Sequence, residues 1–502
     1  MSISLETMLQ LTIILPLISI LGIILAKKSP NIREGVSVIT SLILIYVVIN
    51  LYQALLAGNN IDVFWWEIMP NLSVNFSIEP LGVIFALIAS CLWLITTLYA
   101  IGYMREHKEK NQTRFYACFA LAISTVMGIA FADNLFTLFI FYEVLTLSTY
   151  PLVTHSGTKE AKQGGRVYLG ILLSTSIVFF LLAIAGTWFI TGTLDFKQGG
   201  IFSADVDKSV VGMLLVLFVF GIGKAGIMPF HRWLPAAMVA PTPVSALLHA
   251  VAVVKAGVFT VLKVCVLIFG LDLLNVIPTT QFLLYVAGAS VLLASIVAMR
   301  QDNLKARLAY STISQLGYIT IGALLATSSG VIGSSMHIAT HAFGKITLFF
   351  CAGAILVAAH KSKISEMRGI GHQMPLTMMA FFIASLSIIG VPPAGGTWSK
   401  WFLLMGTIDS EQWILMVILM LSSLLNIAYL LPIPFHAFFS KDNSLPAEKV
   451  VENEGYLVNS QIKEAPLPAL IAISLTTLGC LLLFIYPQPL FDLATSVLTN
   501  RN

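Results

Sequence analysis

Ionisable residues inside long apolar runs are the groups of this sequence that could do chemistry. Five lysines, three histidines and one glutamate stand within such runs: Glu143, Lys224, His249, Lys255, Lys263, His337, His341, Lys345 and Lys400. A charged side chain at the centre of a bilayer costs about 2.5–3.5 kcal/mol or more, so such residues face a bundle interior or a wet path and pair with one another. Carboxylates, amines and imidazoles in that setting bind and release protons. The set therefore indicates a proton pathway.

Glu143 stands in LFIFYEVLTLSTYPL, the one acid at that depth of its run. Its carboxyl could be hydrogen-bonded to neighbouring hydroxyls, or it could pair with a lysine, in which case each charge sets the proton affinity of the other. Lys224, in FVFGIGKAGIMPF, is the expected partner. Burial weakens the hold of a lysine on its proton and a nearby anion restores it, so the two residues could work as a switch.

The run APTPVSALLHAVAVVKAGVF holds His249 and Lys255. A lone histidine in an apolar run is often structural, but this one shares its run with an unpaired lysine and suits a proton relay. Lys263 lies nearer the end of the run, where its long side chain could reach the membrane surface instead.

His337, His341 and Lys345 in HIATHAFGKITLFF follow one another at intervals of four residues, which places them on one helix face. The histidine spacing also occurs in zinc sites, but no H-E-x-x-H glutamate or cysteine accompanies it, so a relay is favoured over a metal. Lys400, in GVPPAGGTWSKWF, carries the last buried charge.

The composition places these residues in a membrane. Of 502 residues, 57% are hydrophobic and only 10% are charged, whereas soluble domains are about one quarter charged. The net charge of +4 is not gathered in a basic patch, so we expect no nucleic-acid partner. The five cysteines lie inside apolar runs without metal-binding spacing and are interpreted as packing residues.

Runs long enough to cross a bilayer predict an all-α polytopic membrane protein of about fourteen helices. The first run is followed, not preceded, by its lysines, so we expect it to be retained as a helix and not cleaved as a signal peptide. Most of the 28 lysines and arginines fall in loops after odd-numbered spans, which predicts that both termini are non-cytoplasmic. The predicted spans are 8–26, 36–57, 79–104, 114–131, 133–154, 166–190, 209–228, 243–269, 281–299, 307–326, 331–358, 376–405, 414–439 and 466–486.

Helix breakers interrupt the seventh and twelfth spans, at Gly223 and Pro229 and at Pro392 and Pro393. Irregular backbone at membrane depth is tolerated only where it is buried in protein or lines a wet cavity, so both breaks are candidate ion sites. Because they lie five spans apart, they suggest two inverted five-helix repeats. The predicted units are 1–113 (helices 1–3), 114–270 (helices 4–8), 271–440 (helices 9–13) and 441–502 (a cytoplasmic loop and helix 14).

Four segments resemble one known family: PFHRWLPAAMVAPTPVSALLHAVAVVKAGVF, RLAYSTISQLGYI, HIATHAFGK and GVPPAGGTWSK. They are similar to the proton-translocating antiporter-like membrane subunits, which comprise the large Mrp antiporter subunits and the related subunits of respiratory complex I and membrane-bound hydrogenases. The resemblance implies fourteen core helices, a glutamate–lysine pair and a central lysine–histidine axis ending on a broken twelfth helix. It assigns Glu143 and Lys224 to the pair, Lys255 to the centre and Lys400 to the end of the axis. His337, His341 and Lys345 match its second-half relay.

A lysine at the last position resembles the D-type subunit of Mrp antiporters and some complex I subunits, whereas one complex I branch has glutamate there. The chain length and the WSKW run favour the D-type Mrp subunit, while Tyr142 stands where tryptophan is common in the family. We therefore expect a subunit of a multi-subunit cation/proton antiporter that moves protons against Na⁺ or a similar ion, with other subunits and the bilayer as partners. The expected location is the plasma membrane of a bacterial or archaeal cell.

Three alternatives stay open. The chain could be the proton-pumping subunit of a complex I or hydrogenase assembly, an enzyme acting on quinone, or a scaffold with inert buried charges. No dinucleotide-binding glycine motif, iron–sulfur cysteine spacing or haem motif is present, so no cofactor is expected in this chain.

Overall fold

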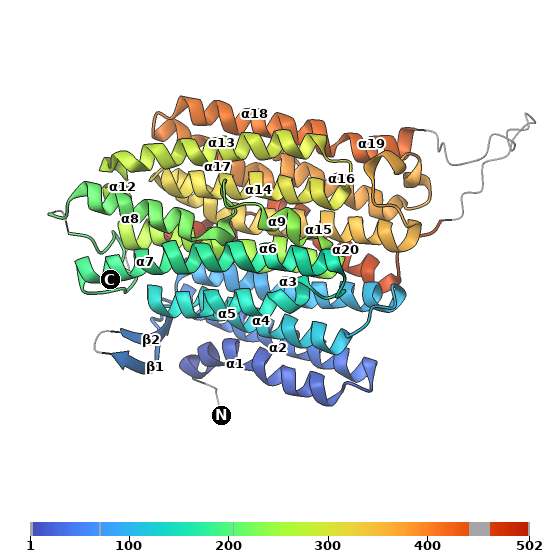
Figure 1. The fold of residues 1–502 in the computed structure, drawn as a ribbon, viewed down its shortest axis with the longest axis horizontal. Helices are drawn as coiled ribbons and strands as arrows, with labels where there is room; N and C mark the ends of the chain where they lie inside the picture. Colours follow the sequence, from blue (N-terminus) through green and yellow to red (C-terminus); the bar gives the residue numbers. More distant parts are fainter. Residues whose placement is uncertain (1–3, 70–71, 204, 441–461, 500–502) are drawn as a thin grey trace, which may run out of the picture.

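The structure, a computed structural model, describes residues 4–69, 72–203, 205–440 and 462–499. Helices dominate it and lie roughly parallel to the long axis of the view (Figure 1). Among the described residues, eleven helical segments are long and apolar enough to cross a membrane. The all-α polytopic fold predicted from the sequence is confirmed.

The first six predicted spans appear as helices in the predicted order. They are α1 (Leu5–Leu25), α2 (Pro30–Leu56), α3 (Pro80–Glu106), α4 (Gln112–Ala130), α5 (Leu135–Val153) and α6 (Lys159–Thr175) continued by the π-helical turn η1 (Ser176–Phe180) and α7 (Leu181–Thr191).

The seventh and eighth spans are each built of several pieces. The seventh is α8 (Lys208–Gly221) and the 3-10 turn η2 (Gly223–Ala225), followed by the short α9 (Trp233–Ala236) and η3 (Ala237–Val239). The eighth is α10 (Thr242–Ala246), the π-helical turn η4 (Leu247–Val251), α11 (Val253–Val264) and a second π-helical turn, η5 (Cys265–Phe269).

The remaining spans follow α12 (Leu271–Val276). They are α13 (Pro278–Arg300), α14 (Leu304–Leu324), α15 (Ser328–Ala359), α16 (Pro375–Ile389) with α17 (Gly396–Asp409), α18 (Trp413–Leu430) with α19 (Pro432–Phe439), and α20 (Leu467–Ile485). The 3-10 turns η6 (Ile364–Glu366) and η7 (Ile370–His372) precede α16, and α21 (Gln488–Ser496) closes the described chain.

Local sequence explains where many of these helices begin. Proline occupies the first helical position of α2, α3, α13 and α16, where its missing N–H would have had no partner. Asn134 and Asn303 cap α5 and α14, because their side chains accept the N–H groups of Thr137 and Ala306.

Both predicted helix breaks are present. α8 ends at Gly221, and α16 ends at Ile389, seven residues before α17 begins at Gly396. The breaks shorten spans seven and twelve, so their halves are not among the eleven long apolar segments. The tenth span, α14, is not among them either, and it carries two basic residues in its first turns. Fourteen crossings, the repeat units and their inverted relation stay predictions.

The eighth span lies at the centre of the bundle. Every residue of its most apolar window is buried, and the neighbouring α15 is nearly as enclosed. α13 and α18 run along one long edge of the molecule, and α1 and α2 run along the opposite edge (Figure 1). α20 packs against both α3 and α15, so it ties the N-terminal helices to the second half of the chain.

One element was not predicted. The strands β1 (Asp62–Met69) and β2 (Leu72–Ser77) form an antiparallel hairpin in which Val63 pairs with Phe76. The alternation of apolar and polar residues in LSVNFS, Leu72–Ser77, is the sequence signal that could have indicated a strand. The hairpin lies at the same end of the bundle as α12 and the C-terminus (Figure 1).

Candidate functional site

Lys224 is held at the first helix break by α5. Its Nζ donates to the carbonyl oxygen of Tyr142 at 2.8 Å and to Thr146 Oγ1 at 2.6 Å, and it lies 3.2 Å from the centre of the Tyr142 ring. The Tyr142 hydroxyl accepts the backbone N–H of Lys224 at 3.1 Å. The ammonium is completely buried and is stabilised by a carbonyl, a hydroxyl and an aromatic face.

Glu143 does not contact Lys224 directly. Both of its carboxylate oxygens are buried without a hydrogen-bond partner, and no ion pair among the described residues joins the two side chains. Successive residues of a helix point about 100° apart, and Lys224 approaches the face of α5 that presents Tyr142 and Thr146. The expected contact is therefore absent here, and the functional pairing of the two residues stays a prediction.

Lys255 contacts His341 across the centre of the bundle. Its Nζ lies 2.5 Å from His341 Nδ1, and both side chains are buried. Lys255 follows the π-helical turn η4, which the sequence did not indicate, and π turns inside helices are frequent at functional sites. The α11 backbone also approaches the first break closely, because a Cβ at Gly257 would lie 2.3 Å from the Lys224 carbonyl carbon.

His337 continues this contact along α15. Its ring lies 5.8 Å from the His341 ring, centre to centre, as the four-residue spacing predicts. Its Nδ1 lies 2.9 Å from Ser399 Oγ on α17 and its Nε2 lies 3.1 Å from Gln315 Oε1 on α14. Both ring nitrogens therefore have partners that can fix the tautomer or pass a proton.

Lys400 lies on α17, just after the second break. Its Nζ donates to the Ile389 carbonyl and to Ser423 Oγ, each at 3.1 Å, and lies 4.5 Å from the Tyr318 ring centre. The Tyr318 ring lies 5.9 Å from the His337 ring and completes the connection. We call this set, Lys255, His341, His337, Tyr318 and Lys400, the central series.

Lys345 lies on α15, four residues after His341, but its hydrogen-bond partners lie outside the central series. Its Nζ donates to Ser311 Oγ at 2.6 Å, and that hydroxyl oxygen also accepts from the Tyr429 hydroxyl at 2.9 Å. The lysine is fully buried, and its hydrogen bond to Ser311 on α14 connects it to Tyr429 on α18.

His249 is not joined to these residues by hydrogen bonds. Neither of its ring nitrogens has a partner among the described residues, and the ring packs 5.0 Å from Phe349. Its role in proton transfer stays a prediction.

Lys263 does not reach the membrane surface. It is completely buried, and its Nζ lies 2.5 Å from Glu79 Oε1 and donates to the Ala132 carbonyl at 2.6 Å. The alternative of a surface-seeking side chain is wrong, because Glu79, at the end of the preceding loop, meets it inside the protein.

Several polar residues of the site were not singled out in the sequence. Ser311, Gln315 and Tyr318 all lie on α14 and contact Lys345, His337 and Lys400, respectively. Their spacing of four and three residues within RLAYSTISQLGYI places them on one helix face, and this periodicity could have found them. The residues that meet them lie on α15 and α17, so which groups they contact depends on tertiary packing.

Family models match most of the chain. A model described as NADH:quinone oxidoreductase/Mrp antiporter, TM, matches residues 132–426, which include every residue of the central series. A second model, described as NADH-Ubiquinone oxidoreductase (complex I), chain 5 N-terminus, matches residues 65–116.

Curated relatives are about one third identical to this chain over the aligned residues. NADH-quinone oxidoreductase subunit N of Desulforudis audaxviator is 33% identical over 364 residues, which cover 72% of each protein. NAD(P)H-quinone oxidoreductase chain 5 of Synechocystis sp. is 31% identical over 66% of this chain, but the match spans only 49% of that relative. The chain thus spans about half the length of such chain 5 relatives.

Two solved structures share the fold over nearly the whole length. A chain of the Mrp complex from Dietzia sp. has a TM-score of 0.85 at 21% identity, with 99% of this chain and 97% of that chain covered. A chain of the membrane-bound sulfane sulfur reductase, an archaeal respiratory membrane complex, has a TM-score of 0.81 at 24% identity, with 97% and 96% covered.

Proposed function

Since this chain belongs to the family of NADH:quinone oxidoreductase and Mrp antiporter membrane subunits, we propose that it is a subunit of a multi-subunit antiporter that exchanges protons for Na⁺ or another monovalent cation. The central series carries the proton in this proposal. The observation that supports it most directly is the 2.5 Å contact between Lys255 and His341. Two basic groups that are so close and so buried cannot both be charged without a large cost in free energy.

Proton transfer along the central series follows from the donors and acceptors that its members present. A proton on Lys255 can pass to His341 across their direct contact, which leaves a neutral amine beside an imidazolium. Positive charge there repels charge on His337 and Lys400, so a proton arriving at one end favours release at the other. Hydroxyls of Ser399 and Ser423 next to His337 and Lys400 can accept and donate in turn.

Lys224 and Glu143 supply the switch that governs this transfer. The ammonium of Lys224 is held by neutral groups of α5, whereas the neighbouring carboxylate has no hydrogen-bond partner. Movement of Lys224 towards Glu143 would bring the charges together and satisfy the carboxylate. The nearby α11 backbone at Gly257 would transmit that movement to Lys255.

A second candidate function keeps the proton path and couples it to electron transfer in other subunits. The relatives named NADH-quinone oxidoreductase subunit N and chain 5 favour it. In that case the chain would be a proton-pumping subunit of a respiratory or hydrogenase complex and would need no exchanged cation. In either case we propose that the chain itself is a transporter subunit without its own redox centre.

The cellular setting is part of the proposal. We place the protein in the plasma membrane of a bacterium or archaeon with both termini on the non-cytoplasmic side, because the basic loops follow odd-numbered spans. The end of the bundle that carries the β1–β2 hairpin would then face the exterior (Figure 1).

The test combines purification with transport. The tagged chain is isolated from native membranes, its partner subunits are identified by mass spectrometry, and the complex is assayed in inverted vesicles with a pH-sensitive dye. Adding Na⁺, Li⁺ or K⁺ should collapse a preformed pH gradient for at least one of the three. Copurification of subunits that bind flavin or iron–sulfur clusters, with no cation-dependent collapse, would contradict the antiporter and support the second candidate.

A further inference from the structure

Glu79 and Lys263 form an ion pair that lies outside the central series. Lys263 Nζ approaches Glu79 Oε1 at 2.5 Å and lies 4.2 Å from the centre of the Phe196 ring. Lys263 is completely buried, and Glu79 is only 7% exposed. Glu79 precedes the first turn of α3, where an acidic side chain would usually cap the helix, yet it makes no capping hydrogen bond. Its carboxylate is directed to the lysine instead.

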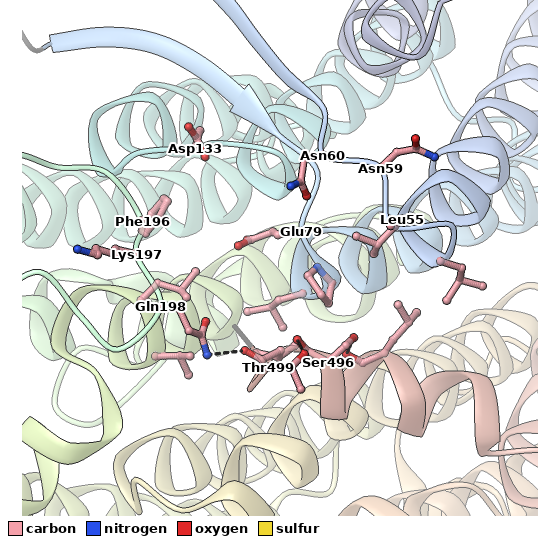
Figure 2. A pocket seen from close by; sticks show the side chains of 18 residues that line it. Leu55, Asn59, Asn60, Glu79, Asp133, Phe196, Lys197, Gln198, Ser496 and Thr499 are labelled. Carbon is pink, nitrogen blue, oxygen red and sulfur yellow. Dashed lines mark hydrogen bonds between the residues drawn. The ribbon is translucent and has the colours of Figure 1, made fainter. Parts of the chain in front are cut away.

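Glu79 also lines a large pocket whose wall combines polar and apolar side chains. The pocket has a volume of about 770 Å³ and lies where the ends of α2, η5 and α21 meet the start of α3 and the loop that carries Phe196. Asn60 and Gln198 also line the pocket, and Figure 2 shows the Glu79 side chain between Asn60 and the loop of Phe196, Lys197 and Gln198. Lys263 is not among the lining residues, so the Glu79 carboxylate stands between the pocket and the buried amine.

The pocket wall is held by backbone hydrogen bonds. The N–H of Lys197 donates to the Leu267 carbonyl at 3.1 Å, and the N–H of Phe196 donates to the Asp133 carbonyl at 3.1 Å. These bonds fix the loop against η5 and against the turn between α4 and α5. The pocket is therefore a feature of connected backbone and not of a few side-chain positions.

Lys263 shares α11 with Lys255 of the central series. The two lysines are eight residues apart, which corresponds to about 12 Å along a helix. In the structure the two amines have separate partners, His341 and Glu79, so a proton passing between them needs a bridging water or a movement of one flexible side chain. α11 thus leads from the His341 contact at the centre of the bundle to the ion pair at the edge of the pocket.

We propose that Glu79 and Lys263 form a proton port that connects Lys255 to water in the pocket. In the outward step an N–H bond of the Lys263 ammonium breaks and an O–H bond forms on Glu79 Oε1, which leaves a neutral amine and a carboxylic acid. Because Oε1 is itself buried, the carboxyl group then rotates and turns its O–H towards the pocket. The acid passes the proton to a water molecule there, giving hydronium and restoring the carboxylate, and the neutral Lys263 amine regains a proton from the Lys255 ammonium. Uptake is the reverse. A neutral pair avoids much of the desolvation cost of two buried charges, so the transfer is accessible at this site.

This port rests on the proposed proton-translocating function and adds to it the route by which protons reach one face of the membrane. A purely structural ion pair that only ties α3 to α11 is the competing explanation. Arginine distinguishes the two, because it preserves the charge and the pairing with Glu79 but does not release its proton in a protein.

The experiment uses the intact complex in inverted vesicles free of Na⁺, Li⁺ and K⁺ and measures proton flux driven by a thiocyanate diffusion potential. This readout needs no exchanged cation. Lys263→Arg and Glu79→Gln should assemble at parental levels and lower the flux about tenfold or more, and the double variant Glu79→Gln/Lys263→Gln, which leaves no unpaired buried charge, should be equally slow. The exposed residues Lys208 and Asp272 provide the matched controls Lys208→Arg and Asp272→Asn, which should conduct like the parent.

Parental flux in Lys263→Arg would overturn the port, and so would parental flux in the double variant if Glu79→Gln fails to assemble. Failure of the antiporter function gives a different pattern, since the parent would then show potential-driven flux without any response to Na⁺, Li⁺ or K⁺.

Discussion

At the scale of single residues, the buried lysines of this protein differ in what holds their ammonium groups. Lys224 is bound by a carbonyl and a hydroxyl, and Lys263 by a carboxylate and a carbonyl, whereas the one partner of Lys255 among the described residues is another base, His341. A positive charge is best stabilised beside an anion and least stabilised beside a base that can itself be charged. We therefore propose Lys255 as the position in the site where a proton is most readily moved.

Glu143→Gln should show whether transport depends on the charge of this side chain or only on its packing at α5. Neither carboxylate oxygen accepts a hydrogen bond, so an isosteric amide loses no partner and the complex should assemble with an unchanged melting temperature. Transport should fall by about 10²-fold, the lower end of what a positioned acid or base contributes. Glu143→Ala should be similarly inactive. Antiport at the parental rate in either variant, at normal membrane levels, would show that the carboxylate has no role in transfer.

Lys400→Arg should assemble but fail to transport. The lysine binds a carbonyl and a hydroxyl and has no carboxylate beside it, so its proton is available for release, whereas a guanidinium keeps its proton. We expect a loss of about 10²-fold in dye-monitored antiport. Lys28→Arg, at an exposed position, is the matched control and should behave like the parent. Lys400→Glu should keep part of the activity. Transport at the parental rate in Lys400→Arg would show that Lys400 is a fixed charge that does not release its proton.

At the scale of elements, the irregular turns position the site. The break before α17 brings Lys400 next to the Ile389 carbonyl, which the interrupted helix leaves without an intrahelical partner. The other two irregular turns act differently, because Lys255, after the π turn η4, contacts His341 on α15, and Lys224, after the end of α8, donates to Tyr142 on α5. A regular helix in place of the second break would use the Ile389 carbonyl itself and leave the buried Lys400 ammonium with one acceptor fewer.

Gly390→Ala should disturb the second break. Gly390 has a φ of +88°, which L side chains rarely adopt, and an added Cβ would lie 2.5 Å from Lys400 Cδ. The backbone strain alone costs about 1–3 kcal/mol, so the melting temperature in detergent should fall and Lys400 should be displaced with loss of antiport. Gly170→Ala, an exposed position of α6 with open space around it, is the control and should not lower the melting temperature. Unchanged stability and transport in Gly390→Ala would argue against the tight contact.

At the scale of the whole molecule, charge is distributed unevenly between the two ends of the bundle. The hairpin, α12 and the C-terminus lie at one end, whereas the basic loop residues Lys361 and Lys363 follow the long helix α15 at the other. Under the positive-inside rule this difference sets the orientation in the membrane. The pocket beside Glu79 would then open to the exterior.

Cysteine labelling tests this orientation. Cysteines placed at the exposed residues Asn59 and Asp272 should react with an impermeant thiol reagent added to intact cells, and one at the exposed Ser362 should react only after the cells are opened. Ser444, for which the sequence makes the same prediction as for Ser362, lies outside the described residues. Because the native cysteines lie in apolar runs and three of them are buried, the parent should give a low background. The reverse labelling pattern would invert the proposed topology.

The sequence by itself determined the class of fold, the broken spans and most of the charges that the protein buries. Each of these follows from local properties: the length of an apolar run, the backbone limits of glycine and proline, and the cost of a charge in lipid. The four-residue spacing of His337, His341 and Lys345 likewise predicted one helix face, and His337 and His341 do stack. Local pattern was sufficient there because the residues share a single helix.

Only the tertiary structure decided which groups meet across helices. It placed Lys224 on the Tyr142 carbonyl instead of the Glu143 carboxylate, Lys263 on Glu79, and Lys255 on His341. These contacts depend on the rotation and depth at which separate helices pack, and many side chains at different sequence positions set that geometry together. The spacing of residues along one helix contains no information about which face of another helix it will meet, so these partners could not be read from the sequence.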